Sequence, residues 1–413
     1  MRIPTRVERA GVAVVSVAAV LALGGADPAV AVSPGLRVPK GATVVVHGRG
    51  NGHGHGLSQY GAQGAAEQGL STRQILAFYY PHTDRGHLGG SVRVLLTETI
   101  GKPTTVVARP GLEVHDLASG RTIPVPAKGR AAAATRWRMS GAGQGDTRVS
   151  YRTGGWHTWR TLTGNGEFRS TRAPLTLALG RTRVTYRGTL RSVAAISKDT
   201  HRITVNKVSL EGYVKGVVPR EMPSSWRPAA LRAQAVAART YASYEAAHHT
   251  DPRFDLCDSS SCQVYGGRTA EASSTDRAVE KTAGQVLTYA GAPAFTQFSA
   301  SNGGQLARSD RPYLVGKPDP YDTVAVDPTY TSWRVRVTAA RIARTWPVLG
   351  RLTSIEVTSR DGHGKWGGRI LRLVLHGTKG DKALSGDDFR GGLGLWSTYL
   401  DLTVPGSSAT RRP

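Results

Sequence analysis

The sequence is poor in cysteine, in acidic residues and in long apolar runs. Its 413 residues include two Cys and three Met, and 29 Asp and Glu stand against 54 Lys and Arg. Two cysteines exclude a small fold held together by several disulfides. Hydrophobic residues make up 39% of the chain, which is enough to bury a core and excludes a disordered or fibrous protein. The length suits one large domain or two ordinary ones.

The main apolar run, residues 11–23, follows Arg2, Arg6 and Arg9 and precedes a small-x-small site at 29–31. This pattern is typical of a signal peptide over residues 1–31, because the run is too short to span a bilayer. It predicts a secreted, wall-associated chain that begins at Val32. An uncleaved amphipathic anchor is the alternative.

The formal charge of +25 predicts an acidic partner. Residues 91–200 alone hold 18 Lys or Arg and six Asp or Glu. Outside a cell, anionic wall polymers and lipid headgroups are the available polyanions. The alternative is a surface that uses arginine only for solubility. No basic helical stripe or RNA-binding aromatic motif is present, so we expect no nucleic-acid partner.

Hydrophobic patterning predicts an α+β fold, with a β-rich lobe and a mixed helix and strand region. Residues 42–46, 104–108 and 181–186 read as strands. Residues 71–80 read as a helix capped by Ser71 and stopped by Pro81, and residues 226–247 as a helix capped by Ser224 or Ser225 with Pro228 in its first turn. The expected parts are 36–90, a β-rich basic lobe at 91–200, a mixed region at 201–402 and a tail at 403–413.

Glu221 is the carboxylate with the most distinctive setting. It lies between Pro219 and Pro223, among apolar residues, just before the predicted long helix. Restricted backbone and partial desolvation would hold the side chain rigidly and raise its proton affinity, as a general acid requires. The alternative is a surface glutamate favoured by the dipole of the following helix.

Residues 216–226 (GVVPREMPSSW), followed by 228–241 (PAALRAQAVAARTY), resemble the SpoIID/LytB family of stage II sporulation protein D lytic transglycosylases and related amidase enhancers. Further similar pieces follow in order over roughly 210–402: 257–267, 298–304, 312–314, 384–390 and 393–395. The resemblance implies a SpoIID-like catalytic region and activity on peptidoglycan glycan strands, with Glu221 as the acid and base. It also implies the alternative of a non-catalytic enhancer that works with a wall amidase.

Residues 48–62 resemble the family's GHGxGMSQxGA segment. In the family pattern this segment follows the catalytic region, whereas here it precedes it. His53, His55, Ser58 and Gln59 offer directional contacts to sugar hydroxyls, so we expect them to bind substrate. His-x-His with no third ligand nearby makes a poor metal site.

The resemblance implies that one carboxylate suffices, because a lytic transglycosylase uses the C6 hydroxyl of its own substrate as nucleophile. A hydrolase normally needs two carboxylates. Glu221 would cleave the bond between N-acetylmuramic acid and N-acetylglucosamine and leave a 1,6-anhydro end. No cofactor is required.

Other candidate substrate contacts lie on the long helix and in a polar loop. Gln234 and Tyr241 share a helix face, whereas Arg239 projects elsewhere, and helix packing is the alternative role for all three. The loop offers Ser299, Ser301, Asn302 and Gly303, for which turn chemistry is the alternative. Tryptophans 137, 156 and 159 could stack on sugars, although core packing is favoured.

Cys257 and Cys262 are expected to form a disulfide if the chain is exported. Some family members are thought to hold zinc at this place with a nearby histidine, which here would be His248 or His249. Three ligands are incomplete for structural zinc, so we favour the disulfide.

Overall fold

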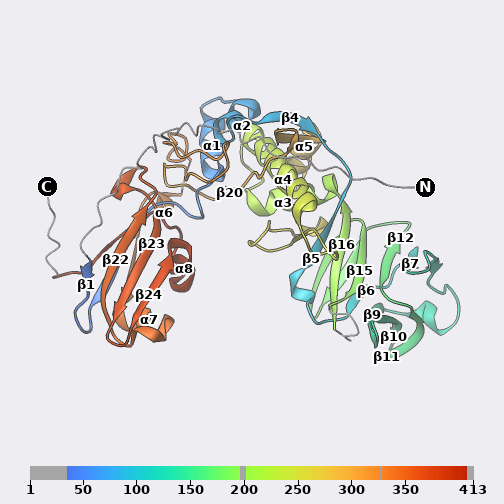
Figure 1. The fold of residues 1–413 in the computed structure, drawn as a ribbon. Helices are drawn as coiled ribbons and strands as arrows, with labels where there is room; N and C mark the ends of the chain where they lie inside the picture. Colours follow the sequence, from blue (N-terminus) through green and yellow to red (C-terminus); the bar gives the residue numbers. More distant parts are fainter. Residues whose placement is uncertain (1–34, 196–200, 326, 407–413) are drawn as a thin grey trace, which may run out of the picture. The chain divides into compact units, whose positions relative to one another are not determined.

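The structure is a computed structural model that describes residues 35–195, 201–325 and 327–406. The predicted signal peptide and most of the predicted tail lie outside the described residues. The described chain contains a long run of strands between helices α2 (Thr72–Tyr79) and α3 (Leu210–Glu221) and a mixture of helices and strands after it, so the predicted α+β class is confirmed (Figure 1). No helix in the described ranges is long and apolar enough to cross a membrane.

The segment predicted to be β-rich forms two sheets. The strand order of the seven-stranded sheet is β17 (Leu256–Cys257), β5 (Ser91–Leu96), β16 (Arg202–Ser209), β15 (Thr189–Ala194), β12 (Gly166–Ser170), β7 (Leu112–Asp116) and β8 (Thr122–Pro124). That of the six-stranded sheet is β11 (Gly155–Leu162), β10 (Asp146–Thr153), β9 (Arg136–Gly143), β6 (Thr104–Val107), β13 (Leu175–Leu179) and β14 (Thr182–Tyr186). Because β16 and β17 follow residue 200, the first sheet extends past the expected boundary.

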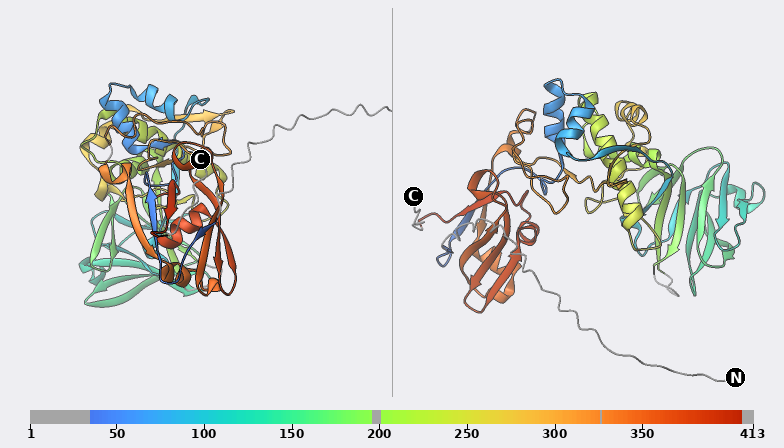
Figure 2. Two further views of the ribbon diagram at one scale, coloured as in Figure 1. Left: turned by 90° about the vertical axis from the view of Figure 1, so that its left-hand side faces the viewer. Right: turned by 45° about the horizontal axis from the view of Figure 1, so that its top comes forward.

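A second group of strands joins the two ends of the described chain. One sheet has the order β1 (Leu36–Arg37), β22 (Leu352–Arg360), β23 (Ile370–Gly377) and β24 (Asp381–Ser385), and another has β21 (Trp333–Thr338), β2 (Thr43–Gly48) and β25 (Leu400–Thr403). The blue β2 lies among the red C-terminal strands in Figures 1 and 2, as its antiparallel pairing with β21 and β25 requires.

Short strands and helices complete the fold. The remaining strands are β3 (Leu57–Ser58), β4 (Asp84–His87), β18 (Gln285–Tyr289), β19 (Ala292–Pro293) and β20 (Phe298–Ser299). The α-helices are α1 (Gln59–Glu67), α2 (Thr72–Tyr79), α3 (Leu210–Glu221), α4 (Pro228–His248), α5 (Ser273–Lys281), α6 (Pro328–Thr331), α7 (Ala339–Thr345) and α8 (Gly386–Leu393). Helix α2 has the predicted cap, since Ser71 and Gln74 form a capping box.

The start of α4 corrects one prediction. Pro228 occupies the first turn as expected, but Arg227 is the capping residue and no side chain caps the helix. Ser224 and Ser225 instead lie in the turn closed by the bond from Trp226 N to Pro223 O, at 3.0 Å. Proline at the first helical position lacks one of the N–H groups that would otherwise be unpaired, and its fixed φ suits the start of a helix.

The buried apolar residues form two main clusters. The larger cluster contains α1 to α5 and the inner faces of the two large sheets. The second combines 38–46 with residues from 333–404. The expected parts 36–90 and 201–402 therefore each contribute to both clusters.

Candidate functional site

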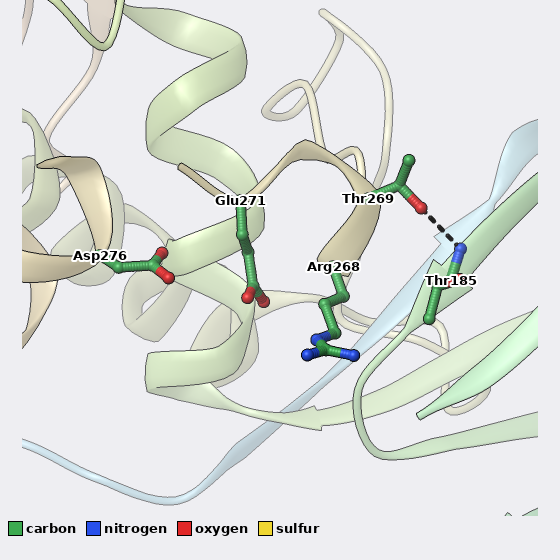
Figure 3. Close-up of a pocket in the computed structure, with 5 residues that line it drawn as sticks. All are labelled: Thr185, Arg268, Thr269, Glu271 and Asp276. Atoms are coloured by element: carbon green, nitrogen blue, oxygen red, sulfur yellow. Dashed lines mark hydrogen bonds between the residues drawn. The ribbon is translucent and has the colours of Figure 1, made fainter. Parts of the chain in front are cut away.

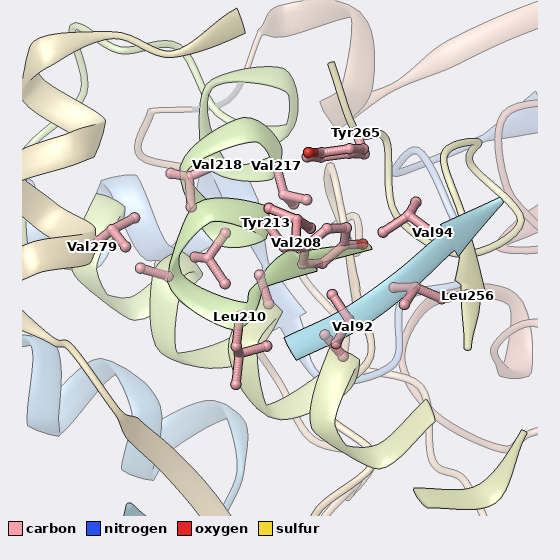
Figure 4. Packing of buried hydrophobic residues seen from close by; sticks show 14 of the residues in the cluster. Val92, Val94, Val208, Leu210, Tyr213, Val217, Val218, Leu256, Tyr265 and Val279 are labelled. Atoms are coloured by element: carbon pink, nitrogen blue, oxygen red, sulfur yellow. The ribbon is translucent and has the colours of Figure 1, made fainter. Parts of the chain in front are cut away.

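Helix α3 carries Glu221 as its last residue. Ser209 caps the helix by accepting from Gly212 N, and Tyr213 and Val217 are among its fully buried residues, packed in the cluster of Figure 4. Gly216 allows close packing, because a Cβ there would lie 2.5 Å from the Tyr265 ring. The sequence placed Glu221 between two prolines, just before the predicted long helix, without predicting a helix at the acid itself. In the structure, Pro219 lies inside the last helical turn and Met222 begins the extended chain.

The carboxylate of Glu221 is held from two sides. Gln59 Nε2 donates to Oε2 at 2.9 Å, and the backbone N–H of Val264 donates to Oε1 at 2.9 Å. The side chain is half-buried, while Gln59 is only 6% exposed. Two donors fix the position of both oxygens, which is the rigidity expected of a positioned acid.

The pKa of Glu221 lies above its ordinary value. Burial, which disfavours the charged form, is the main cause. The bonds from Val264 and Gln59 and the positive charge of Arg220 act in the opposite direction and limit the rise. Burial thus favours the neutral acid, whereas the two donors and Arg220 favour the carboxylate. Both forms are needed if one residue is to donate and then accept a proton.

The two resembling segments meet at this carboxylate. Gln59 begins α1 directly after Ser58, which caps that helix by accepting from Gly61 N at 3.0 Å. The GHG-type segment therefore contacts the acid even though it precedes the Glu221 segment in the sequence. The sequence missed the backbone N–H of Val264, and the similar piece around 263–267 was the signal that could have found it.

The polar loop at 299–304 is organised by two buried carboxylates. Ser58 and Ser301 donate their hydroxyls to the two oxygens of Asp322, the latter at 2.8 Å, and Asn302 Nδ2 donates to Asp319 Oδ2 at 2.7 Å. The N–H groups of Gly303 and Gly304 point to Asp322 as well.

Ser58 is 1% exposed, and Ser301 and Asn302 are not exposed at all. The burial of these three side chains therefore does not support a direct contact with substrate. Gly303 donates its N–H to Asp322 and so belongs to the turn around that carboxylate. Burial raises the pKa of Asp319 to about 6, with Asp322 as the next cause. No motif or spacing in the sequence pointed to either aspartate as part of this loop.

His53 and His55 anchor the glycine-rich segment. Their rings stack at 5.3 Å, His55 N donates to His53 Nδ1 at 3.0 Å, and His55 Nδ1 lies 3.2 Å from Ala307 O. Burial lowers the pKa of His53 to about 3 and also lowers that of His55. Ser299 accepts from Gly54 N at 3.2 Å. None of these three residues has a described hydrogen bond to Glu221, and their substrate contacts stay predictions.

The long helix turns its predicted contacts inward. Arg239 is not exposed and forms an ion pair of 2.8 Å with Glu211. Gln234 is not exposed either, and its amide has no hydrogen-bond partner in the part of the chain that the structure describes. The Tyr241 ring stacks on Phe295 at 5.5 Å. These three side chains therefore pack within the protein. The burial of Gln234 and Arg239 does not support direct contact with substrate.

Cys257 and Cys262 form a disulfide with a Cα–Cα distance of 5.5 Å, as predicted. His249 packs on Phe254 at 4.9 Å between ring centres. Across the described ranges, no group of three or more His, Cys, Asp or Glu side chains is arranged to hold a metal ion. The bonded sulfurs do not fit the zinc alternative, because thiolates are the ligands zinc requires.

A cavity of about 410 Å³ is lined in part by two neighbours of Glu221. Its lining includes Arg220, which precedes Glu221 in the sequence, and Val264, whose N–H donates to the Glu221 carboxylate. Asp258 and Tyr186 also line it. Thr269 joins it to the neighbouring hollow of Figure 3, where its hydroxyl accepts from Thr185 N at 2.8 Å. Burial raises the pKa of Asp258. The cavity is thus lined by a chain neighbour and a hydrogen-bond donor of the acid, whereas Glu221 itself is not part of its lining.

The comparisons agree with the resemblance. Residues 198–289, which include Glu221 and Val264, match the family model described as SpoIID, Stage II sporulation protein. The part of the chain that carries the acid is therefore similar to the SpoIID family, as the resemblance implies.

Among curated proteins, the chain is 43% identical over 115 residues to the amidase enhancer of Bacillus subtilis (strain 168), and 29% identical over 241 residues to its stage II sporulation protein D. It is also 39% identical over 117 residues to an uncharacterized protein of Brachyspira hyodysenteriae. These matches cover 26%, 50% and 28% of this chain and 15%, 64% and 32% of the relatives. The chain thus spans less than two thirds of each relative.

Proposed function

We propose that this protein is an exported peptidoglycan lytic transglycosylase and that Glu221 is its acid and base. The observation that carries the proposal is the half-buried Glu221 carboxyl, which is held by Gln59 and Val264 and has a raised pKa. The one-carboxylate reaction rests on the family resemblance; Asp258, which lines the cavity beside Val264, accepts its hydrogen bonds from Thr97 instead.

The reaction balances without water or a cofactor. Protonated Glu221 gives its proton to the glycosidic oxygen, and the bond from C1 of N-acetylmuramic acid to that oxygen breaks. The resulting carboxylate removes the proton of the C6 hydroxyl of the same sugar, and O6 bonds to C1. Glu221 ends protonated and ready for another cycle. The tethered hydroxyl supplies the proximity that an activated water would otherwise need.

Gln59 is a positioning residue in this scheme. Its amide N–H stabilises the carboxylate that forms after the first proton transfer, and Val264 N–H does the same on the other oxygen. Both donors are already in place in the free protein, so the carboxylate forms without rearrangement of its neighbours.

The test is a digest of purified glycan strands analysed by mass spectrometry. We expect anhydro-ended products, lighter by one water than hydrolysis products, from the unaltered protein, and none from Glu221→Gln. Glu280→Gln is the matched control, because Glu280 is exposed and pairs with Lys215 away from the site. Products with hydrolysed, reducing ends, or full activity of Glu221→Gln, would overturn the proposal.

The second candidate is a non-catalytic enhancer of a wall amidase, favoured by the 43% identity to a relative named amidase enhancer. Under this alternative, the chain releases no glycan fragments alone, and Glu221→Gln still stimulates a purified wall amidase on intact walls. Loss of stimulation in Glu221→Gln would exclude it.

A further inference from the structure

Four arginines gather on the outward face of the six-stranded sheet. They are Arg136 and Arg138 on β9 and Arg148 and Arg152 on β10, strands that are neighbours at one end of the sheet. Figure 1 labels these strands beside β11. Arg148 and Arg152 are exposed, and the other two are half-buried. We call these four residues the arginine face.

The alternation of the strands explains why these side chains share a face. Trp137 and Met139 of β9 and Val149 of β10 are buried in the core, so the residues between them point the other way. Antiparallel register places Arg152 directly opposite Arg136, and Ser150 opposite Arg138. The arginine face is therefore a consequence of sheet register rather than of loops.

The arrangement is unfavourable for the free protein. Like charges directly opposite each other destabilise an antiparallel pair. The positive charge of Arg148 acts on Arg138, where it adds to burial in lowering the pKa. In the described part of the chain, no carboxylate lies within ion-pair distance of the arginine face, whereas Arg93, Arg239 and other arginines pair with aspartate or glutamate. An anion bound here would relieve this repulsion.

A tryptophan completes the surface. Trp156 of β11 lies opposite Arg152, and the Arg138 guanidinium stacks over its ring at 4.1 Å. Stacking holds that guanidinium flat against the sheet, with its edge free to donate hydrogen bonds. A half-exposed indole also gives a polymer an apolar surface for its carbon atoms.

The spacing suits a polymer with one anion in each repeat. Opposite residues on adjacent strands lie about 5 Å apart, and alternate residues on a strand about 7 Å apart. Such density exceeds that of a glycan strand whose carboxylates occur on every second sugar. Guanidinium groups bind phosphate through two parallel hydrogen bonds and keep their charge at any physiological pH.

We propose that the arginine face binds the polyol-phosphate chains of an anionic wall polymer, and so holds the protein near its glycan substrate. A membrane surface fits less well, because none of the exposed large apolar side chains in the described residues lies on β9, β10 or β11. The inference takes only the wall location from the proposed function and does not depend on Glu221.

The experiment measures binding of the purified chain to lipid-free poly(glycerol phosphate), at several salt concentrations and in the Glu221→Gln background. We expect the double variant Arg136→Gln/Arg152→Gln to weaken binding by at least about tenfold and to flatten its dependence on salt, because fewer counterions are released. The Glu221→Gln background removes the proposed acid, so the assay measures binding alone. Loss of binding can therefore be distinguished from failure of the proposed reaction.

The matched control is Arg334→Gln/Arg336→Gln. These two arginines are also exposed, alternate on strand β21, and have no ion pair among the described residues. We expect them to leave binding within about twofold of the parent value. An equal loss in both double variants would show that net charge alone acts, and would overturn the assignment.

Other ligands supply further outcomes. Tighter binding to phosphatidylglycerol vesicles, or equal binding to duplex DNA of the same phosphate content, would also overturn the proposal. Arg148→Gln gives a second reading should the double variant unfold, since a single exposed change on β10 leaves the core untouched. We expect a smaller loss of affinity in the same direction, and an unchanged affinity would count against the arginine face.

Discussion

The bond from Gln59 to Glu221 makes a sharp prediction about pH dependence. Replacing Gln59 by Met keeps a buried side chain of similar size but removes the N–H that points at Glu221 Oε2 from 2.9 Å. This bond favours the carboxylate form, so its loss raises the pKa of Glu221 further. Because the proposed reaction begins with a proton on Glu221, activity should persist to higher pH in the variant.

The size of the shift follows from the strength of the bond. A hydrogen bond to a charged group contributes about 1.5–3 kcal/mol, and a pKa unit corresponds to about 1.4 kcal/mol. Some of this is recovered by water or by movement of the carboxylate, so we expect an upward shift of about one pH unit. The Val264 N–H remains, which limits the change.

The assay is the rate of anhydro-product release from glycan strands, measured as kcat/KM across pH. Gln63→Met is the control, because Gln63 is also buried on α1 but donates to Glu67 at 2.7 Å and accepts from Arg227 N. We expect its profile to match that of the parent protein. A Gln59→Met profile with an unmoved or lowered descending limb would refute the role given to this bond.

Two further predictions concern stability. Cys257→Ser/Cys262→Ser should lower the free energy of unfolding by about 2 kcal/mol, because the disulfide closes a short loop, and urea titration of oxidised and reduced parent protein checks this. For Asp319, whose pKa rises to about 6, the unfolded chain loses its proton first. Its contribution to stability is therefore fully present below about pH 4, falls by up to about 3 kcal/mol as pH rises to about 6, and then stays constant. Asp319→Asn should remove this part of the slope in urea titrations across that range, and an unchanged slope would contradict the assignment.

The local elements were largely predictable from the sequence. The strands near 43–48, 104–107 and 182–186 and the capped helix at 72–79 follow from β-branched runs and from a Ser71 cap with Pro81 beyond it. These signals act within a few residues, so a pattern along the chain contains them. The start of α4 was misplaced because either of two serines could serve as a cap, whereas Pro228 alone sufficed.

The site was predictable only in part. The setting of Glu221 was visible in its apolar and proline neighbours, and the family motifs supplied its role. The contact with Gln59, 162 residues away, depends on how α1 packs and has no local signal. Polar residues of 299–303 resembled a binding loop, but Asp319 and Asp322 draw them inward. Exposure of a polar side chain depends on such distant partners, which a sequence pattern does not contain.

The position of β2 between β21 and β25 affects how the molecule can assemble. Pairing of His47 with Asp401 and Arg334 closes loops of several hundred residues, a high-contact-order step in which chain entropy is lost before contacts form. Until the segment 400–403 is available, β2 keeps one unpaired edge. The loop that leads from β2 to Gln59 is then tethered on fewer sides, so the order around the acid depends on one of the last strands along the chain.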